Sequence, residues 1–404
     1  MSEIDRRSGS AHAGPLSGIR ILDLSIAATG PYAVAMLADQ GARVIKVERP
    51  GIGDIARWVG SQVKGISALY QVCNRGKRSI ALNLDAPAGR EIVRALAARS
   101  DVVVQNWRPG VADKLGIGYA DLRRDDLVYV SISGFGDSGP YAAKGAYDTV
   151  IQAYGGVAIN EADPVTQQPR FARQVLADKV TALTVAQAIT AALFARERGQ
   201  GGQHVRLTML DAVVSFLWID AAGHEAILEA DRSRPGAFAA NTRPFEFKDG
   251  FGVCTPTGDS DFFGMCRAFG VDGWDDPRLA SPALRYQNPE LTGELYRRCL
   301  AAATQMTTAQ AMARMEAERV PCGQVLSLAE LPENEQVRAM GLFREEQHPI
   351  AGRIRMPRHV ARFEATPAEV GAPAPGLGAD TDAVLDELGM GARAAELRAA
   401  GVVA

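Results

Sequence analysis

Residues 19–48 read IRILDLSIAATGPYAVAMLADQGARVIKVE, and this stretch decides the fold class. Residues 19–24 form an apolar run with one basic interruption, which is typical of a buried parallel strand. Gly30 and Pro31 follow, then a helical pattern over residues 32–39 and a second strand at 43–48. A strand, a helix and another strand in succession predict a βαβ unit.

The same alternation continues through the first half of the chain. Further strands are expected at residues 79–84, 102–105, 127–131 and 204–209. Helices are expected at residues 86–98, 178–198 and 211–218. This order predicts an α/β fold with a parallel sheet and helices on both faces.

The pattern changes after residue 220, and we expect a smaller second domain there. Its segments are a connection rich in Ala, Arg and Gly, a β-hairpin, a helical region and a turn, at residues 220–240, 245–254, 261–318 and 319–323. Residues 351–378 are rich in Gly and Pro and are expected to be extended, before a short helix at 380–388.

The whole-chain composition excludes several classes of function. The net charge is −3 and the pI is near 6.0, which argues against a nucleic-acid partner. No run of 18 uninterrupted apolar residues occurs, so we expect no membrane span. Residues 1–15 lack the apolar core of a secretory signal and are expected to form a disordered tail. The five cysteines are scattered without a CxxC pair, which favours a soluble cytoplasmic protein with reduced thiols and no metal site.

The distribution of lysine hints at an anion site. The chain has 44 basic residues, of which only 7 are lysine. Six of these seven lie between residues 46 and 179. The first half of the chain is therefore the expected place for an anionic ligand.

A GxGxxG string, Gly134 to Gly139, follows the strand expected at 127–131. Such a string can bind a dinucleotide when a helix begins directly after it. Here Pro140 follows, and residues 142–145 do not form a convincing first helical turn, so we favour a Gly-rich turn with another role. GxSxG, GxxxxGK[ST] and HExxH are absent, which weakens the case for a serine hydrolase, a P-loop enzyme or a zinc protease.

Asp178 stands at the start of the longest helical pattern, and two interpretations remain open. Its side chain could cap the helix by accepting a backbone N–H. Alternatively, the helix dipole could keep the carboxylate ionised and positioned for nucleophilic attack. The residue pattern alone does not separate these interpretations.

The order of several segments resembles the class III coenzyme A transferases. This group contains formyl-CoA and carnitine-CoA transferases and also methylacyl-CoA racemases. The resemblance covers roughly residues 15–390, and the order of the segments is more specific than any one of them. The matching segments are residues 16–24, 30–31, 41–51, 74–79, 105–110, 134–140, 146–148, 205–211, 320–323 and 374–378.

The resemblance implies an enzyme that moves coenzyme A from an acyl-CoA thioester to a small carboxylic acid acceptor. Asp178 matches the family nucleophile, which would form a mixed anhydride and then an aspartyl-CoA thioester, with no cofactor beyond CoA as substrate and no metal. Tyr147 and Asp148 occupy the catalytic position where racemases carry a His-Asp pair, so transfer is favoured over epimerisation. The implied CoA-binding residues are Ala27, Ala28, Thr29, Arg49, Arg75, Lys77, Asn106, Trp107, Arg108, Lys114 and Lys144.

The resemblance also implies an architecture. A large Rossmann-like CoA-binding domain would comprise residues 16–224 and 336–404, with a small α+β domain inserted at 225–335. Two chains would interlock as a homodimer. Arg170 or Arg173 would favour a dicarboxylic acid such as succinate if either reached the acyl pocket, whereas the single glycine within residues 255–260 argues against oxalate or formate.

Three alternatives remain. The chain could be an acyl-CoA racemase or isomerase, or an intramolecular CoA transferase that moves CoA between two carboxyls of one substrate. It could also be a non-enzymatic acyl-CoA binding protein. The donor and the acceptor acid stay open.

Overall fold

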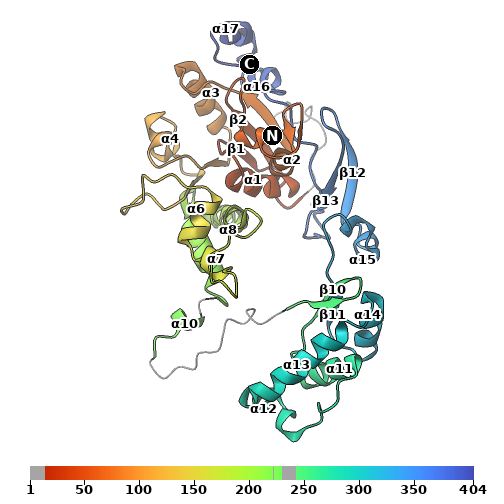
Figure 1. Cartoon of the computed structure of the whole chain (residues 1–404). Helices are drawn as coiled ribbons and strands as arrows, with labels where there is room; N and C mark the ends of the chain where they lie inside the picture. The colour runs from red at the N-terminus through yellow and green to blue at the C-terminus, as the bar shows by residue number, and fades with distance from the viewer. Residues whose placement is uncertain (1–13, 222, 230–242) are drawn as a thin grey trace. The chain divides into compact units, whose positions relative to one another are not determined.

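The computed structural model describes residues 14–221, 223–229 and 243–404 (Figure 1). The expected N-terminal tail and the expected connection at 220–240 fall mostly outside these residues. The chain divides into a large unit, Met1–Ala230 with Gly341–Ala404, and a small unit, Asp231–Met340. Each unit is described by itself.

The large unit is built on a six-stranded sheet in the order β5-β2-β1-β6-β7-β8, and all its neighbouring strands are parallel. In chain order these strands are 3-2-1-4-5-6, which is the Rossmann order. The α/β prediction with a parallel sheet is therefore confirmed. The strands are β1 Arg20–Asp23, β2 Arg43–Glu48, β5 Lys77–Ala81, β6 Val102–Gln105, β7 Val128–Ser133 and β8 Gln203–Thr208.

Alternate residues along these strands pack into two separate apolar cores. Leu22, Val103 and Tyr129 belong to the core that contains α3 and α16. Ile21 and Val104 belong to the other core, which contains α1 and α8. Because successive strand side chains point to opposite faces, helices cover both sides of the sheet.

The helices of the large unit include those that carry Thr29, Asp148 and Asp178. They are α1 Thr29–Asp39, α2 Ala68–Asn74, α3 Pro87–Ala97, α4 Val111–Lys114, α5 Tyr119–Leu122, α6 Asp148–Tyr154, α7 Val157–Asn160, α8 Leu176–Ala195, α9 Met209–Leu217, α10 Gly223–Ala226, α16 Thr381–Glu387 and α17 Ala394–Ala399. Two antiparallel strand pairs accompany them, β3 Gln62–Val63 with β4 Ile66–Ser67 and β12 Phe343–His348 with β13 Gly352–Pro357.

Three helices of the large unit begin earlier than expected, among them α9, which begins at Met209 rather than at residue 211. α1 begins at Thr29, before Pro31, because proline is tolerated in a first turn where its missing N–H has no helical partner. α8 begins at Leu176, two residues before Asp178. By length and composition alone, the helical stretch Leu176–Gln200, which comprises α8 and the residues directly after it, could cross a membrane.

The small unit packs helices against a three-stranded sheet in the order β11-β10-β9. The hairpin predicted at 245–254 is confirmed, whereas the turn predicted at 319–323 ends in a strand that pairs with β10. A buried core of Phe245, Met265 and Leu295 joins the sheet and helices. The elements are β9 Phe245–Phe247, β10 Gly250–Cys254, α11 Asp259–Phe269, α12 Pro282–Gln287, α13 Pro289–Ala303, α14 Thr308–Ala317, β11 Cys322–Gln324 and α15 Glu335–Ala339.

Candidate active site

The topology of the sheet marks a place for a ligand. From β1 the chain runs to β2 and β5 on one side, and from β6 it runs to β7 and β8 on the other. In open α/β sheets, ligands bind at the carboxyl ends of the strands where this direction reverses. Residues 27–29 follow β1 and residues 106–108 follow β6, so six of the predicted CoA contacts lie at this switch point.

Asp178 reaches the same place from α8. It is the third residue of the helix, and Val175, which has no side-chain acceptor, occupies the N-cap. The interpretation of Asp178 as a capping residue is therefore wrong. Its carboxylate accepts a hydrogen bond from the hydroxyl of Thr29, the first residue of α1. Two helix N-terminal turns, which carry partial positive charge, thus meet at this carboxylate.

The environment of Asp178 changes its acidity. Burial raises the pKa of this carboxyl to about 6; the Thr29 hydrogen bond acts in the opposite direction, and the charge of Asp148 adds to the rise. The group is still mainly ionised at neutral pH. A carboxylate that is both ionised and unusually basic is suited to nucleophilic attack.

Asp148 and Gln152 fix the chain that leads into Asp178. Asp148 is buried at the start of α6 and accepts the backbone N–H of Asp178 at 3.1 Å. The Gln152 side chain donates to Asp148 and accepts the N–H of Ala172 at 2.9 Å. Tyr147, by contrast, is 71% exposed. Sequence reasoning missed Gln152, and its only signal is a polar residue on the buried face of a short helix.

The turn between β1 and α1 is held from two directions. The Asn106 side chain accepts the N–H of Ile26 and donates to its carbonyl, both at 2.8 Å. The N–H of Ala27 donates to Asp54 at 2.8 Å. Ala27 has φ +65°, which is uncommon for a residue with a Cβ. Ala28 and Thr29 are buried directly after it.

The predicted cationic contacts divide into two groups. Arg49, Arg108 and Lys114 have exposed side chains that a phosphate can reach. Lys144 is also exposed, and its ammonium lies 4.8 Å from the centre of the Tyr141 ring and 4.5 Å from that of Tyr154. These four residues remain candidates for CoA binding.

Lys77 and Arg75, which were also predicted to bind CoA, are buried and bonded to groups of the protein itself. The Lys77 ammonium is fully buried and donates to Asp23 at 2.7 Å, to the Pro31 carbonyl at 2.8 Å and to Asn74 at 3.0 Å. All three of its N–H donors are therefore used. Arg75 pairs with buried Asp39 at 2.6 Å.

The lysine distribution overestimated the anion site, because two of the six clustered lysines are buried in the protein and the other four are exposed. Lys46 is also fully buried, 2.8 Å from Asp54, so it serves a carboxylate of the protein rather than a ligand. The signal that could have revealed a buried ionic network was the presence of Lys46 and Lys77 within parallel strands, which are normally buried. Sequence reasoning missed that network, including Asp54.

A cavity of about 270 Å³ opens beside the switch point. The predicted CoA contacts Trp107 and Arg108 lie on its wall, together with Gly136 and His204. The His204 ring stacks on Tyr119 with centroids 4.5 Å apart. No helix begins within residues 134–147, all of which the structure describes, so the Gly-rich string is a turn at this cavity and not a dinucleotide loop.

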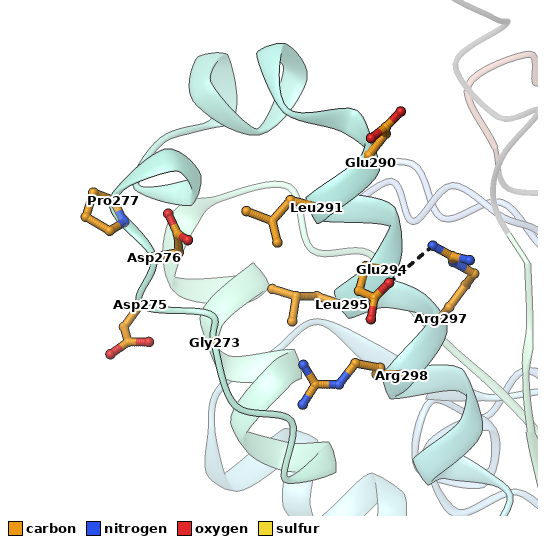
Figure 2. Close-up of a pocket in the computed structure, with 10 residues that line it drawn as sticks. All are labelled: Gly273, Asp275, Asp276, Pro277, Glu290, Leu291, Glu294, Leu295, Arg297 and Arg298. Carbon is orange, nitrogen blue, oxygen red and sulfur yellow. Dashed lines mark ion pairs between the residues drawn. The ribbon is translucent and has the colours of Figure 1, made fainter.

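A second hollow lies in the small unit, between α13 and residues 273–277 (Figure 2). Figure 2 shows Leu291, Leu295 and Arg298 pointing from α13 toward that segment. The predicted site residues, all within the described chain, do not line it. Its acidic residues outnumber its two arginines, which makes it a poor site for an anion such as CoA.

The comparisons with known proteins agree with this geometry. Residues 16–381 match the family model described as CoA-transferase family III. The chain belongs to this family. It is 33% identical to mouse succinyl-CoA:glutarate CoA-transferase over 93% of the chain and 86% of the relative. It is also 33% identical to succinate–glutarate CoA-transferase of Agrobacterium fabrum, over 93% and 96%, and 30% identical to formyl-CoA:oxalate CoA-transferase of Rhodopseudomonas palustris, over 96% and 97%.

A solved structure gives the same result. The CAIB/BAIF family protein from Brucella suis superposes with a TM-score of 0.78 at 30% identity, covering 93% of this chain and all of that one. The family resemblance found in the sequence is confirmed. The chain is a class III CoA-transferase, which acts on acyl-CoA and carboxylic acids. A binding protein without catalytic activity is no longer an alternative.

Proposed function

We propose that Asp178 is the nucleophile through which this family III transferase moves CoA to a carboxylic acid. One observation supports the proposal above the others. The Asp178 carboxylate, partly buried and with a raised pKa, is hydrogen-bonded to Thr29 at the switch point of the sheet. The residues beside Thr29 are the ones predicted to contact CoA.

The reaction would proceed through two kinds of acyl intermediate. An Asp178 oxygen attacks the thioester carbonyl, the C–S bond breaks, and CoA thiolate leaves a mixed anhydride. The thiolate then attacks the Asp178 carbonyl carbon, the donor acid leaves as a carboxylate, and an aspartyl-CoA thioester remains. The acceptor carboxylate reverses both steps and restores Asp178. The donor thioester, the aspartyl-CoA thioester and the product thioester are similar in energy, so the exchange is reversible and a carboxylate suffices as nucleophile.

The neighbouring residues would have distinct roles. The Thr29 hydroxyl orients one oxygen of Asp178 and leaves the other for the substrate. Asp148 positions the backbone of Asp178 and does not touch the reacting atoms. Tyr147, which is exposed and cannot act as the base that histidine provides in racemases, would border the acyl group.

We propose a dicarboxylic acid as donor or acceptor. The named substrates of the mouse and Agrobacterium relatives are succinyl and glutaryl derivatives, which carry a second carboxylate. Arg170 is paired with Asp163, so Arg173, exposed in the segment leading into α8, is the better candidate to meet that second carboxylate.

We further propose that two chains associate through α8 and α9. Leu183 and Phe194 are 57% and 67% exposed and lie eleven positions apart on one face of α8. Phe216 and Trp218, at the end of α9, are 47% and 50% exposed. A face with this many large apolar side chains is suited to a second copy of the chain.

The test of the nucleophile is covalent trapping. The protein is incubated with succinyl-CoA and, separately, acetyl-CoA, treated with hydroxylamine or borohydride, and digested for peptide mass spectrometry. We expect a trapped adduct on Asp178, and a fall in kcat on the order of 10³ or more in Asp178→Ala. Asp382→Ala, which changes an exposed first-turn aspartate of α16, is the control and should trap normally.

Turnover in deuterated solvent, measured with and without an acceptor acid, separates the remaining alternatives. A racemase would introduce solvent deuterium at the α-carbon without an acceptor acid. An intramolecular transferase would need no acceptor and would incorporate no deuterium. An Asp178→Ala enzyme that retained its kcat would contradict the proposed nucleophile.

A further inference from the structure

Two fully buried lysines lie on either side of the turn that carries Thr29. Lys46, in β2, donates from Nζ to the carbonyl of Ser25 at 2.8 Å. Lys77, at the start of β5, donates from Nζ to the carbonyl of Pro31 at 2.8 Å. The two ammonium groups therefore hold both ends of the turn from inside the fold.

Asp54 connects one of these lysines to the middle of the turn. Its Oδ1 accepts the N–H of Ala27 at 2.8 Å and that of Ala56 at 2.9 Å, and its Oδ2 lies 2.8 Å from Lys46 Nζ. Ala27 keeps its unusual φ of +65° while its N–H is held in this way. A strained backbone persists only where surrounding bonds specify it, and it is concentrated at functional sites.

We propose that Asp54 and Lys46 are positioning residues of the transferase, which fix the turn after β1 so that the Thr29 hydroxyl faces the Asp178 carboxylate. The inference rests on the proposed role of Asp178 as nucleophile. Both side chains are fully buried, so neither touches the substrate. They act through the backbone of Ser25 and Ala27.

Charge is essential to this arrangement. Burial by itself lowers the pKa of Lys46, but the carboxylates of Asp54, Asp23 and Glu48 raise it above its ordinary value, so the ammonium stays charged. An asparagine at position 54 has one acceptor end and one donor end. Its single oxygen could accept a hydrogen bond from either Lys46 or the Ala27 N–H, and its amide N–H group would then face the other donor.

The experiment is therefore the pH dependence of kcat in Asp54→Asn. Because the Thr29 hydroxyl lowers the pKa of Asp178, a displaced Thr29 moves the acidic limb of the kcat profile to higher pH. We expect an upward shift of about one pH unit, which by itself lowers kcat at pH 7 by roughly twofold. Thr29→Val should give the same shift, and the double variant no larger one, because the two changes act on one hydrogen bond. Additive shifts would overturn the proposal.

A matched control separates positioning from loss of stability. Asp39→Asn breaks another buried ion pair, with Arg75, at the opposite end of α1. We expect a lower Tm with an unchanged acidic limb. If Asp39→Asn moved the limb as far as Asp54→Asn does, general destabilisation would explain the effect and the proposal would fail.

Asn106→Ala covers the case in which Asp54→Asn does not fold. It removes the two hydrogen bonds to Ile26 in the same turn without leaving a buried charge. We expect a smaller limb shift in the same direction, and an unmoved limb would overturn the proposal. Failure of the proposed nucleophile gives a different result, since Asp178 would then carry no trapped adduct in the unaltered enzyme.

Discussion

The raised pKa of Asp178 makes a prediction about stability. The folded chain binds this proton more tightly than the unfolded chain, because its pKa is about 6 rather than 3.8. The resulting stabilisation is fully present below about pH 3.8 and is lost as the pH rises through 6. Asp178→Asn removes the ionisation, so its stability relative to the unaltered enzyme should increase by about 1–3 kcal/mol between pH 4 and pH 7.5.

Urea unfolding at the two pH values measures this difference. Asp163→Asn is the contrasting variant, because backbone hydrogen bonds from Thr166 and Val165 lower the pKa of that partly buried carboxyl below 3.8. Its stability relative to the unaltered enzyme should hardly change between pH 4 and pH 7.5 and should rise only as the pH falls below about 4. A pH-independent difference for Asp178→Asn would contradict the burial of this carboxylate.

At the scale of single residues, the sequence predicted which residues belong to the site better than it predicted which groups those residues contact. Asp178 was found because it stands near a helix start in a family-like order of segments. Its hydrogen bond to Thr29 joins residues 149 positions apart, and no local pattern contains such a contact. Lys77 was predicted as a CoA contact from the family resemblance alone, whereas tertiary packing buries it against Asp23.

At the scale of elements, Gly30 in the first turn of α1 has no room for a methyl group. A Cβ there would collide with the side chain of Ser25, which is buried and bonded to Asp23. We expect Gly30→Ala to lower the free energy of unfolding by about 1–3 kcal/mol and to reduce kcat, because the collision displaces Thr29.

Gly293→Ala in α13 provides the opposite expectation. A Cβ at that helical position meets nothing within 4 Å. The variant should be more stable by about 0.5–1 kcal/mol with unchanged kcat, since alanine has the higher helix propensity. Chemical denaturation and steady-state kinetics of both variants check the pair. A Gly30→Ala enzyme as stable and active as the unaltered one would contradict the packing described.

Strands were predicted more accurately than helix starts, for a physical reason. A strand buried on both faces is rich in apolar residues, and β2 and β6 have the predicted bounds although β2 also carries Arg43, Lys46 and Glu48. A helix start is recognised by its cap, and α8 begins after Val175, which gives no such signal. β11 was missed because three residues, one of them glycine, carry no strand periodicity, and the strand exists only through its pairing with β10.

At the scale of the whole molecule, one topological feature brings the distant residues together. The Rossmann order places the turns after β1 and β6 side by side, and α8 packs beside α1 against the same core. Residues from four parts of the chain, near positions 27, 54, 106 and 178, thereby form one site. The order of segments along the chain predicted this fold, while the register that places Thr29 against Asp178 required the packed structure.

The exposed apolar face of α8 gives the last prediction. Leu183 is part of the apolar pattern that defines this helix, yet it is exposed, as is Phe194 on the same face. If a second chain covers this face, Leu183→Glu with Phe194→Glu should move the solution mass from twice 43.0 kDa toward 43.0 kDa. Burying two carboxylates in an apolar interface is unfavourable by several kcal/mol, on the order of the binding energy of a modest dimer.

Sedimentation equilibrium of the double variant measures this change. Leu328→Glu alters an even more exposed leucine in the small unit and should leave the mass unchanged. A double variant that remains a dimer would place the contact elsewhere, and an unaltered enzyme that sediments as a monomer would contradict the proposed dimer. If the double variant were monomeric with full kcat, one chain would hold the complete active site. A loss of kcat in parallel with the loss of mass would mean that the partner chain contributes to it.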